Sequence, residues 1–301
     1  MMRVLITGGS GYIGSALCQK MLSCDSFEIY NYDLVNGEDI SNLDQLLSVM
    51  TSFHPEVVIH LAALSDIPRC NSDYKTMINY NIIGVKNILE AMVKCQVSRL
   101  LFASSCAVYK ESSYLLEEDF ICRPTSNYGY SKLLGEHIIE SYSSRYPQLK
   151  CTMLRFFNIA GYNPYFKDDH RFASHSRLLP LSEDKPFTIF GTNYNTSDGT
   201  AIRDYVYIDD LVHILIFITI VKNQKTGIFN IASGKGVSVY EVLLMYHSIF
   251  GYPTQVYLGD RRYGDMEKVI GNSDKLYKKY GLKVDHNIKD IVTSYKDKEH
   301  N

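Results

Sequence analysis

The sequence predicts an α/β fold in which a parallel β-sheet is covered by helices on both faces and is joined to a smaller α/β region. Two observations predict it. Short apolar runs alternate with helical segments through the first half of the chain, and the first apolar run leads directly into three spaced glycines. Alternating strands and helices build parallel sheets with both faces covered. The 301 residues suffice for one large or two tightly joined domains.

The expected elements follow one another in a regular order. We expect strands at 3–7, 27–32, 57–60, 100–104 and 152–156, and helices that begin at 13, 43, 74 and 128. Beyond residue 158 the pattern becomes irregular, because glycines, prolines and charges are frequent. We therefore assign 1–158 to a cofactor-binding domain and 159–202 with 233–301 to a substrate-binding domain. Residues 203–232 are expected to return to the main sheet.

The glycine loop follows the first expected strand. In such a loop Gly8 allows a tight turn, Gly11 lets the backbone approach a pyrophosphate, and Gly14 lets the next helix pack closely on the strand. The helix N-terminus also presents N–H groups and a partial positive charge to an anion. The loop therefore predicts a dinucleotide site in a Rossmann-type doubly wound parallel sheet.

Asp33 stands at the end of the second expected strand. It lies close to the ~20-residue offset at which a carboxylate binds the ribose hydroxyls of NAD. No Lys or Arg follows before Asp39, so no nearby cation would pair with a 2′-phosphate. The sequence therefore predicts NAD, rather than NADP, as the cofactor.

Tyr128 and Lys132 are four residues apart, which places them on one face of a helix. An ammonium close to the tyrosine hydroxyl, together with a positive nicotinamide ring, lowers the tyrosine pKa from its ordinary value near ~10. We expect Tyr128 to act as a base near neutral pH. The pair follows an apolar strand that ends in Ser104-Ser105-Cys106.

Further motifs extend along nearly the whole chain. They are His60-Leu61-Ala62-Ala63, Asn81-Ile82-Ile83-Gly84, Arg155-Phe156-Phe157-Asn158, Ile189-Phe190-Gly191, the segment 198–205 and Arg262-Tyr263-Gly264-Asp265. With these motifs the chain resembles the extended short-chain dehydrogenase/reductase superfamily and, within its NAD-dependent epimerase/dehydratase family, the UDP-glucose (UDP-galactose) 4-epimerases. The resemblance implies epimerisation of a UDP-hexose at carbon 4 through a transient 4-keto sugar, with no net consumption of NAD.

The resemblance also implies residue roles. It places Ser105, Tyr128 and Lys132 at the catalytic positions. Arg203 and Arg262 would bind phosphates, because guanidinium groups present fixed forks of donors that suit a pyrophosphate. The implied cofactor-binding residues are Gly8, Gly11, Tyr12, Ile13, Gly14, Asp33, Asp39, Ile40, Leu61, Ala62, Ala63, Asn81, Tyr128, Lys132 and Phe156. The implied substrate-binding residues are Ser105, Asn158 near the sugar diphosphate, Phe190, Arg203, Arg262, Asp265 at the uridine ribose, and Val269.

Val269 is of interest because it lies four positions after Asp265. In the 4-epimerases the residue at that position lies beside the sugar's 2-substituent, where a tyrosine accompanies hexoses and smaller residues accompany N-acetylhexosamines. A valine leaves room for an acetamido group. It cannot by itself reject a hydroxyl, because pocket size discriminates by only about 1–3 kcal/mol. We therefore expect activity on both UDP-glucose and UDP-N-acetylglucosamine.

Two segments depart from the family pattern. Only five residues separate Asp33 from Asp39, so the adenosine side must be abbreviated, with Asp39 and Ile40 still expected at the adenine. The second departure concerns Arg171 and the segment 176–180, either of which can be aligned with a family asparagine. Neither is assigned a role.

Two alternatives remain open. The segment 104–106 also resembles the site of GDP-fucose synthase, in which a cysteine takes part in proton transfer, so a related nucleotide-sugar epimerase or reductase is the second interpretation. A catalytically inactive dinucleotide-binding sensor is the third. The presence of Ser105, Tyr128 and Lys132 together argues against a sensor. Elimination and decarboxylation are disfavoured, because no carboxylate follows Ser105 where the corresponding enzymes place one.

Composition and charge restrict the partners. The formal net charge of -2 gives no electrostatic case for nucleic acid or an anionic membrane. The apolar run 211–221 is too short to span a bilayer. Seven scattered cysteines without a CxxC pair favour a reducing, cytoplasmic location and no structural zinc. We expect no metal, no nucleic acid and no membrane partner.

Two long helices are expected near 74–95 and 128–146. They carry apolar residues at helical spacing, namely Ile78, Ile82, Val85, Leu134 and Ile138. In the superfamily these helices commonly form a four-helix interface, and twofold pairing is the commonest oligomer. The resemblance therefore implies a homodimer.

Overall fold

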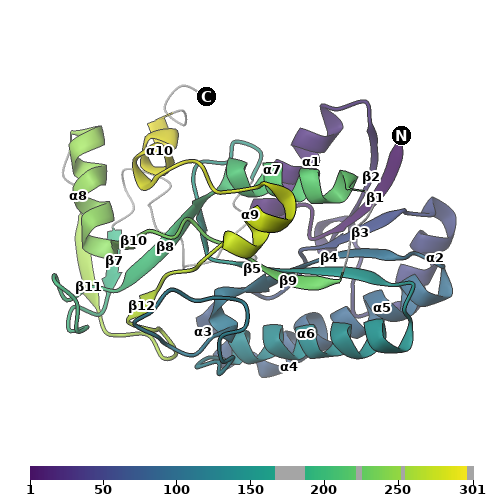
Figure 1. The fold of residues 1–301 in the computed structure, drawn as a ribbon, viewed down its shortest axis with the longest axis horizontal. Coiled ribbons are helices and arrows are strands. Elements are labelled where there is room, and N and C mark those ends of the chain that lie inside the picture. Colours follow the sequence, from purple (N-terminus) through teal and green to yellow (C-terminus); the bar gives the residue numbers. More distant parts are fainter. Residues whose placement is uncertain (167–186, 222–225, 252–254, 297–301) are drawn as a thin grey trace.

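The computed structural model describes residues 1–166, 187–221, 226–251 and 255–296. Within these residues, six parallel strands form a sheet in the order β2-β1-β3-β4-β5-β9, beside a smaller region (Figure 1). The strands are β1 (Met2–Thr7), β2 (Phe27–Tyr32), β3 (Val57–His60), β4 (Arg99–Ser105), β5 (Lys150–Phe156) and β9 (Gly227–Ile231). The predicted doubly wound parallel sheet is confirmed.

Both faces of this sheet are buried. Along β1, Val4 and Ile6 pack into one apolar cluster and Leu5 into another, and none of the three is exposed. Period-two side-chain alternation with apolar residues on both sides is typical of strands that are covered on both faces. The apolar run at the start of the chain therefore reports a central strand rather than a surface one.

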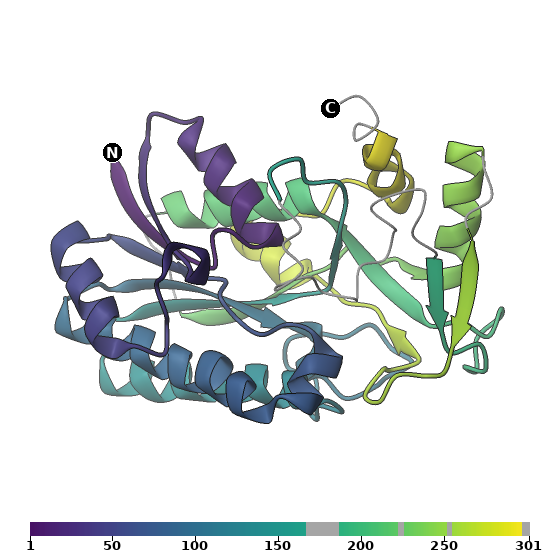
Figure 2. The ribbon, with the colours of Figure 1, turned by 180° about the vertical axis from the view of Figure 1, so that it is seen from behind.

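Helices cover the two faces, as Figures 1 and 2 show. One face carries α1 (Tyr12–Leu22), α7 (Ile208–Ile220) and α9 (Asp274–Tyr280); the other carries α2 (Leu43–Phe53), α5 (Gly84–Lys94) and α6 (Asn127–Arg145). Leu17 and Leu211 belong to the core of the first face, and Met50 and Ile88 to that of the second. Helices α1, α2 and α6 each follow a strand of the sheet, so their N-termini lie toward the edge where the strands end.

The helix expected from residue 74 is composite. It consists of α4 (Tyr74–Ile78), a π-helical turn at Asn79–Ile83 and α5, and it is preceded by the short α3 (Ile67–Ser72). Within the π-helical turn, the Asn81 amide accepts a hydrogen bond from Leu64 N–H (2.8 Å) and donates one to Leu64 O (2.9 Å). The turn therefore holds the loop that follows β3. Single π-helical turns are frequent beside functional sites.

The smaller region is built around β8 (Ile202–Tyr207). This strand pairs with β6 (Asn158–Ala160), β10 (Gly236–Ser238) and β12 (Lys268–Val269), while β7 (Phe187–Phe190) pairs with β11 (Val256–Gly259). Helices α8 (Val239–Phe250) and α10 (Ile288–Thr293) complete it. Its core joins Phe187, Tyr205, Val242 and Ile291.

Two details of the expected domain division are wrong. Of residues 203–232, β9 pairs with β5 and α7 packs on α1, but β8 belongs to the second sheet. Asp204 explains this, because its buried carboxylate accepts backbone N–H groups of Ser233, Gly234 and Gly271. Conversely α9 lies within 233–301 but covers β9, where the Phe229 and Tyr280 rings meet at 5.4 Å. Strand pairing is decided by such tertiary contacts, which alternation alone does not reveal.

The apolar run at 211–221 lies mainly in α7, a buried helix of 13 residues. Across the described ranges, no helix combines the length and the apolar character needed to cross a membrane. The same ranges hold no group of three or more His, Cys, Asp or Glu side chains that could bind a metal ion.

Candidate active site

A cavity of about 690 Å³ lies where β1, β4 and β5 end, between the large sheet and the smaller region. Open parallel sheets bind ligands at this edge. The cavity is lined by Gly8, Gly11, Tyr12, Ile13, Gly14, Asp33, Ile40, Leu61, Ala62, Ala63, Ser105, Tyr128, Lys132, Phe156, Asn158, Arg203, Arg262, Asp265 and Val269, all of them sequence-predicted site residues. Three other predicted residues, Asp39, Asn81 and Phe190, do not line it. Arg171 and the segment 176–180 lie outside the described residues.

The glycine loop fits a dinucleotide pyrophosphate. Gly8 has a φ of +73°, and a Cβ at Gly14 would lie only 2.2 Å from the Gly8 carbonyl oxygen. A Cβ at Gly11 would meet only the Gly8 oxygen, at 3.2 Å, so this position opens onto the cavity. Helix α1 begins at Tyr12, with its N-terminal dipole at the cavity. The loop thus has the tight turn, the close packing of α1 and the open access to the backbone that a pyrophosphate site requires.

Asp33 stands at the end of β2, as predicted. Its carboxylate accepts hydrogen bonds from the N–H groups of Ser10 (2.9 Å) and Val35 (3.1 Å). Glu38, which the sequence reasoning missed, lies beside it and accepts from the Asp33 N–H (3.2 Å) and from the Tyr30 hydroxyl (2.5 Å). Both carboxylates line the cavity. Two acidic groups at this position repel a 2′-phosphate. The short segment between Asp33 and Asp39 was the feature of the sequence from which Glu38 could have been predicted.

The two residues predicted to contact the adenine differ in their positions. Ile40 lines the cavity, but Asp39 does not. The Asp39 N–H donates to Gln45 (2.8 Å), and its carboxylate accepts from the Ser41 N–H (2.8 Å). Asp39 therefore closes a local turn rather than facing the cavity, and the prediction for this residue needs that correction.

Asn81 also lies behind the cavity rather than in it. Besides its two hydrogen bonds to Leu64, it donates to the Ser131 hydroxyl at 2.9 Å. It is 2% exposed. The polar atoms of Asn81 are thus committed to the loop after β3 and to α6, which indicates an indirect, supporting part in the site.

Helix α6 presents Tyr128 and Lys132 to the cavity. The helix begins after Ser126, whose side chain accepts the Gly129 N–H (3.1 Å) and caps it. The Lys132 ammonium donates to the Ala103 carbonyl oxygen at 2.8 Å and lies 5.9 Å from the centre of the Tyr128 ring. Tyr128 is hydrogen-bonded to the Ser105 side chain. The three residues predicted to be catalytic are therefore together.

Burial dominates the electrostatics of this group. It lowers the pKa of Lys132 to about 8, although the neighbouring Cys70 and Glu136 act in the opposite direction. It raises the pKa of Tyr128 well above the ordinary value, more than the hydrogen bond from Ser105 lowers it. The expected lowering of the Tyr128 pKa is thus not produced by the protein's own groups, because removing a phenolate from water is too costly.

The arginines approach from the smaller region. Arg203 donates to the carbonyl oxygens of Ile202 (3.0 Å) and Glu267 (3.3 Å). Arg262 pairs with Asp265, with both nitrogen–oxygen distances at 2.9 Å. The Arg262 guanidinium also lies 4.6 Å from the centre of the Phe190 ring, which explains why Phe190 supports the site without lining it.

Cys106 also lines the cavity, in a short 3₁₀ turn at Cys106–Val108. Burial raises the pKa of its thiol to about 12. The thiol is therefore protonated at neutral pH, and a thiolate, the form that reacts as a base or nucleophile, is disfavoured.

Comparisons with known proteins agree with this arrangement. The model of the NAD dependent epimerase/dehydratase family matches residues 4–232. A UDP-glucose 4-epimerase from Lactobacillus helveticus is 30% identical over 97% of this chain and 96% of its own length.

Two solved structures share the fold. A UDP-glucose 4-epimerase from Thermus thermophilus, in complex with NAD, superposes with a TM-score of 0.85 at 26% identity, covering 98% of this chain and 99% of that one. A UDP-Glc/GlcNAc 4-epimerase from Campylobacter jejuni superposes with a TM-score of 0.80 at 25% identity, covering 100% and 99%. With the glycine loop, the acidic pair and the Ser-Tyr-Lys group in one cavity, the chain belongs to the NAD-dependent epimerase/dehydratase family.

Proposed function

We propose that this protein is an NAD-dependent epimerase that inverts carbon 4 of a UDP-hexose. The observation that carries the proposal is the content of one cavity: a glycine cradle, the group Ser105, Tyr128 and Lys132, and the guanidinium groups of Arg203 and Arg262. The relatives named UDP-glucose 4-epimerase support the same reaction.

The protein's own groups have separate tasks in this proposal. Tyr128 removes the proton from the 4-hydroxyl of the sugar and later returns it, and Ser105 holds the reacting oxygen by a hydrogen bond. When bound, NAD supplies a hydride acceptor and a positive charge that favours the Tyr128 phenolate. Lys132 adds a second positive charge on the same helix face. Arg203 and Arg262 bind the diphosphate, because fixed guanidinium forks suit phosphate oxygens.

A reaction with no net redox change distinguishes an epimerase from a dehydrogenase. Purified protein given UDP-galactose is expected to form UDP-glucose, seen by NMR as inversion at carbon 4, while the nicotinamide absorbance stays constant after the first turnover. A series of other UDP-sugars, tested in the same way, would identify the preferred substrate. Stoichiometric accumulation of NADH would indicate a dehydrogenase and would rule out the proposed reaction.

The GDP-fucose-synthase-like alternative is disfavoured by the state of Cys106. That alternative needs the cysteine to exchange protons, but burial raises the pKa of the Cys106 thiol to about 12. Proton transfer is efficient when the pKa of the group lies near the operating pH. Burial raises the pKa of the Tyr128 hydroxyl as well, but the positive charges of the nearby Lys132 and of a bound nicotinamide ring would both favour its phenolate, so Tyr128 is the better candidate.

We also propose that the protein acts on both UDP-glucose and UDP-N-acetylglucosamine. Val269 supports this, because it is a small side chain on β12 that lines the cavity. It pairs in register with Arg203, so it belongs to the part of the cavity assigned to the UDP-sugar. The similar protein from Campylobacter jejuni is named a UDP-Glc/GlcNAc 4-epimerase.

A homodimer in a reducing, cytoplasmic environment is the third part of the proposal. The seven cysteines are all free thiols, which supports the environment. For the dimer, the predicted apolar face needs one correction: Val85 is 2% exposed and packs inside the core of the monomer. Ile83 and Leu134 are 40% and 46% exposed, and they provide accessible apolar area on α6 and beside α5.

The dimer makes a prediction about mass. Light scattering at micromolar concentration is expected to give about twice the 34.4 kDa of the chain. Leu134→Arg should shift the mass toward the monomer, because it places a charge in the apolar interface. Leu22→Arg, at another exposed leucine on α1, is the matched control and should leave the mass unchanged. A monomeric wild-type mass at that concentration would refute the pairing.

A further inference from the structure

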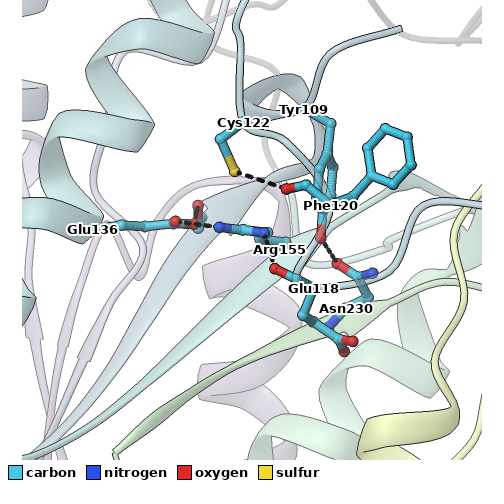
Figure 3. A network of polar contacts seen from close by, with 8 residues as sticks. Tyr109, Glu118, Phe120, Cys122, Glu136, Arg155 and Asn230 are labelled. Atoms are coloured by element: carbon cyan, nitrogen blue, oxygen red, sulfur yellow. Dashed lines mark hydrogen bonds and ion pairs between the residues drawn. The ribbon is translucent and has the colours of Figure 1, made fainter. Parts of the chain in front are cut away.

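Behind the proposed catalytic group lies a buried ion pair that takes no direct part in the proposed proton and hydride transfers. Arg155 on β5 donates from Nε and from one terminal nitrogen to the two carboxylate oxygens of Glu136, at 2.9 and 2.7 Å. Its other terminal nitrogen donates to the Glu118 carbonyl oxygen at 3.0 Å. Figure 3 shows Arg155 between Glu136 on one side and Tyr109 and Asn230 on the other.

The loop after β4 is anchored to the same pair. The Arg155 guanidinium lies 4.7 Å from the centre of the Tyr109 ring, and the Tyr109 hydroxyl donates to Asn230 at 2.7 Å (Figure 3). Groups from α6 and from the loop thus meet at the guanidinium of a β5 residue, and β9 is joined to them through Tyr109. A fork of five donors suits such a junction, and a lysine could not replace it.

Glu136 also contacts β4, directly beside the proposed catalytic serine. The Ser104 hydroxyl donates to the Glu136 carboxylate at 2.5 Å, and Ser104 immediately precedes Ser105. One helical turn earlier, Lys132 donates to the Ala103 carbonyl oxygen at 2.8 Å. Helix α6 is therefore attached to the end of β4 at two successive turns.

Tyr128, Lys132 and Glu136 occupy one face of α6, because they are four residues apart. A shift of the helix along its axis would move Tyr128 relative to Ser105. The attachments of Lys132 and Glu136 to β4 oppose that shift. Bidentate pairing with Arg155 fixes the Glu136 carboxylate in both position and plane.

The surroundings of Lys132 leave Glu136 as its counter-charge. The titratable and charged groups that face Lys132, directly or through Glu136, are His60 on β3, Cys70 on α3, Cys106 after β4, Tyr128 and Glu136 on α6, and Arg155 on β5. Burial lowers the pKa of His60 to about 3 and raises those of Cys70 and Cys106 to about 12. Near pH 7 these three groups are uncharged. Among the described groups around Lys132, the negative charge is therefore that of Glu136.

We propose that Glu136 is a positioning residue: held by Arg155 and Ser104, it fixes α6 against β4 and supplies the negative charge that faces Lys132. This role rests on the proposed epimerase function, since it matters through Tyr128 and Lys132. Arg155 in turn positions Glu136. Neither residue lines the cavity, so neither contacts the substrate or the cofactor.

The first test measures Lys132 itself and needs no substrate. In protein carrying ¹³C-labelled lysine, the Lys132 resonance is assigned by its absence in Lys132→Arg, and its titration is followed by NMR. Glu136→Gln keeps the shape and the hydrogen-bond acceptor but removes the charge. It should lower the midpoint of the Lys132 titration by about 1 pH unit or more, because an opposite charge at close range favours the ammonium. Glu140→Gln, at an exposed position one turn further along α6, is the matched control and should not move the midpoint.

The second test uses turnover and separates positioning from stability. In Glu136→Gln the fall of kcat at alkaline pH should begin at lower pH than in the wild type, with KM for UDP-galactose unchanged, and Glu136→Asp should restore part of the profile. The double variant Glu136→Gln/Arg155→Met removes both buried charges, so its melting temperature should recover relative to Glu136→Gln. Its Lys132 midpoint should nevertheless stay below that of the wild type.

The outcomes are distinguishable. An unchanged Lys132 midpoint in Glu136→Gln, or a double variant that regains the wild-type midpoint together with its stability, would overturn the positioning role. If Glu136→Gln does not fold, the double variant carries the same test. A wild-type protein that inverts no UDP-hexose would contradict the proposed function, and the NMR titration would still decide the relation between Glu136 and Lys132.

Discussion

Replacing Tyr128 with phenylalanine is expected to lower kcat for UDP-galactose by roughly 100-fold or more, as for the loss of a positioned acid–base group. The substitution removes only the hydroxyl. Lys132 keeps its hydrogen bond to the Ala103 carbonyl oxygen, and the glycine loop is unaffected. The protein should therefore retain its NAD. Turnover by NMR and the nicotinamide content of the denatured protein check the two parts of this expectation.

Two neighbouring substitutions are the controls for Tyr128. Ser105→Ala should cost less than Tyr128→Phe, because it removes a hydrogen bond to Tyr128 but not the acid–base group itself. Cys106→Ala should have a small effect, since burial keeps this thiol protonated. A larger loss in Cys106→Ala than in Tyr128→Phe would favour the fucose-synthase-like chemistry over the reaction proposed here.

Val269→Tyr is expected to separate the two proposed substrates. Val269 is 3% exposed and lines the cavity, so a tyrosine at this position must extend into the space that an acetamido group would occupy. The value of kcat/KM for UDP-N-acetylglucosamine should fall by about 10- to 200-fold or more, while that for UDP-glucose changes little. The ratio of the two values, measured in wild type and variant, is the readout.

Val269→Ala serves as the matched control, because it enlarges the cavity and should leave both substrates active. Melting temperatures of both variants establish that the buried position tolerates the change. If the ratio of kcat/KM values is the same in Val269→Tyr as in the wild type, Val269 does not lie beside the 2-substituent, and the proposed breadth of substrates loses its structural support.

Local residue patterns were sufficient for the glycine loop and for the Tyr-Lys pair. Gly8, Gly11 and Gly14 required a particular turn and close packing, and the φ of Gly8 and the surroundings of Gly14 satisfy that requirement. The spacing of Tyr128 and Lys132 placed them on one face of α6, because helical geometry depends only on sequence separation. The alternation of apolar strands and helices predicted the parallel sheet, because it too is a pattern of local sequence.

Contacts between distant segments decided the rest. Asp204 draws β8 into the second sheet through backbone groups about 30 and 67 residues away. Asp39 is different, because a local turn engages its carboxylate: it accepts the Ser41 N–H and does not line the cavity. The protein's own groups raise the pKa of Tyr128, because burial, which outweighs the hydrogen bond from Ser105, is a property of the packed site. The spacing of Glu136 places it on the same face of α6 as Lys132. Its proposed positioning role can be inferred only from its contacts with Arg155 and Ser104, which the fold brings to it. The sequence by itself determined the sheet, the dinucleotide loop and the Tyr-Lys pair, since each depends on local spacing. The tertiary structure decided which strands share a sheet, the burial that sets the pKa values, and the partner of each buried charge. These three depend on which residues the fold brings together.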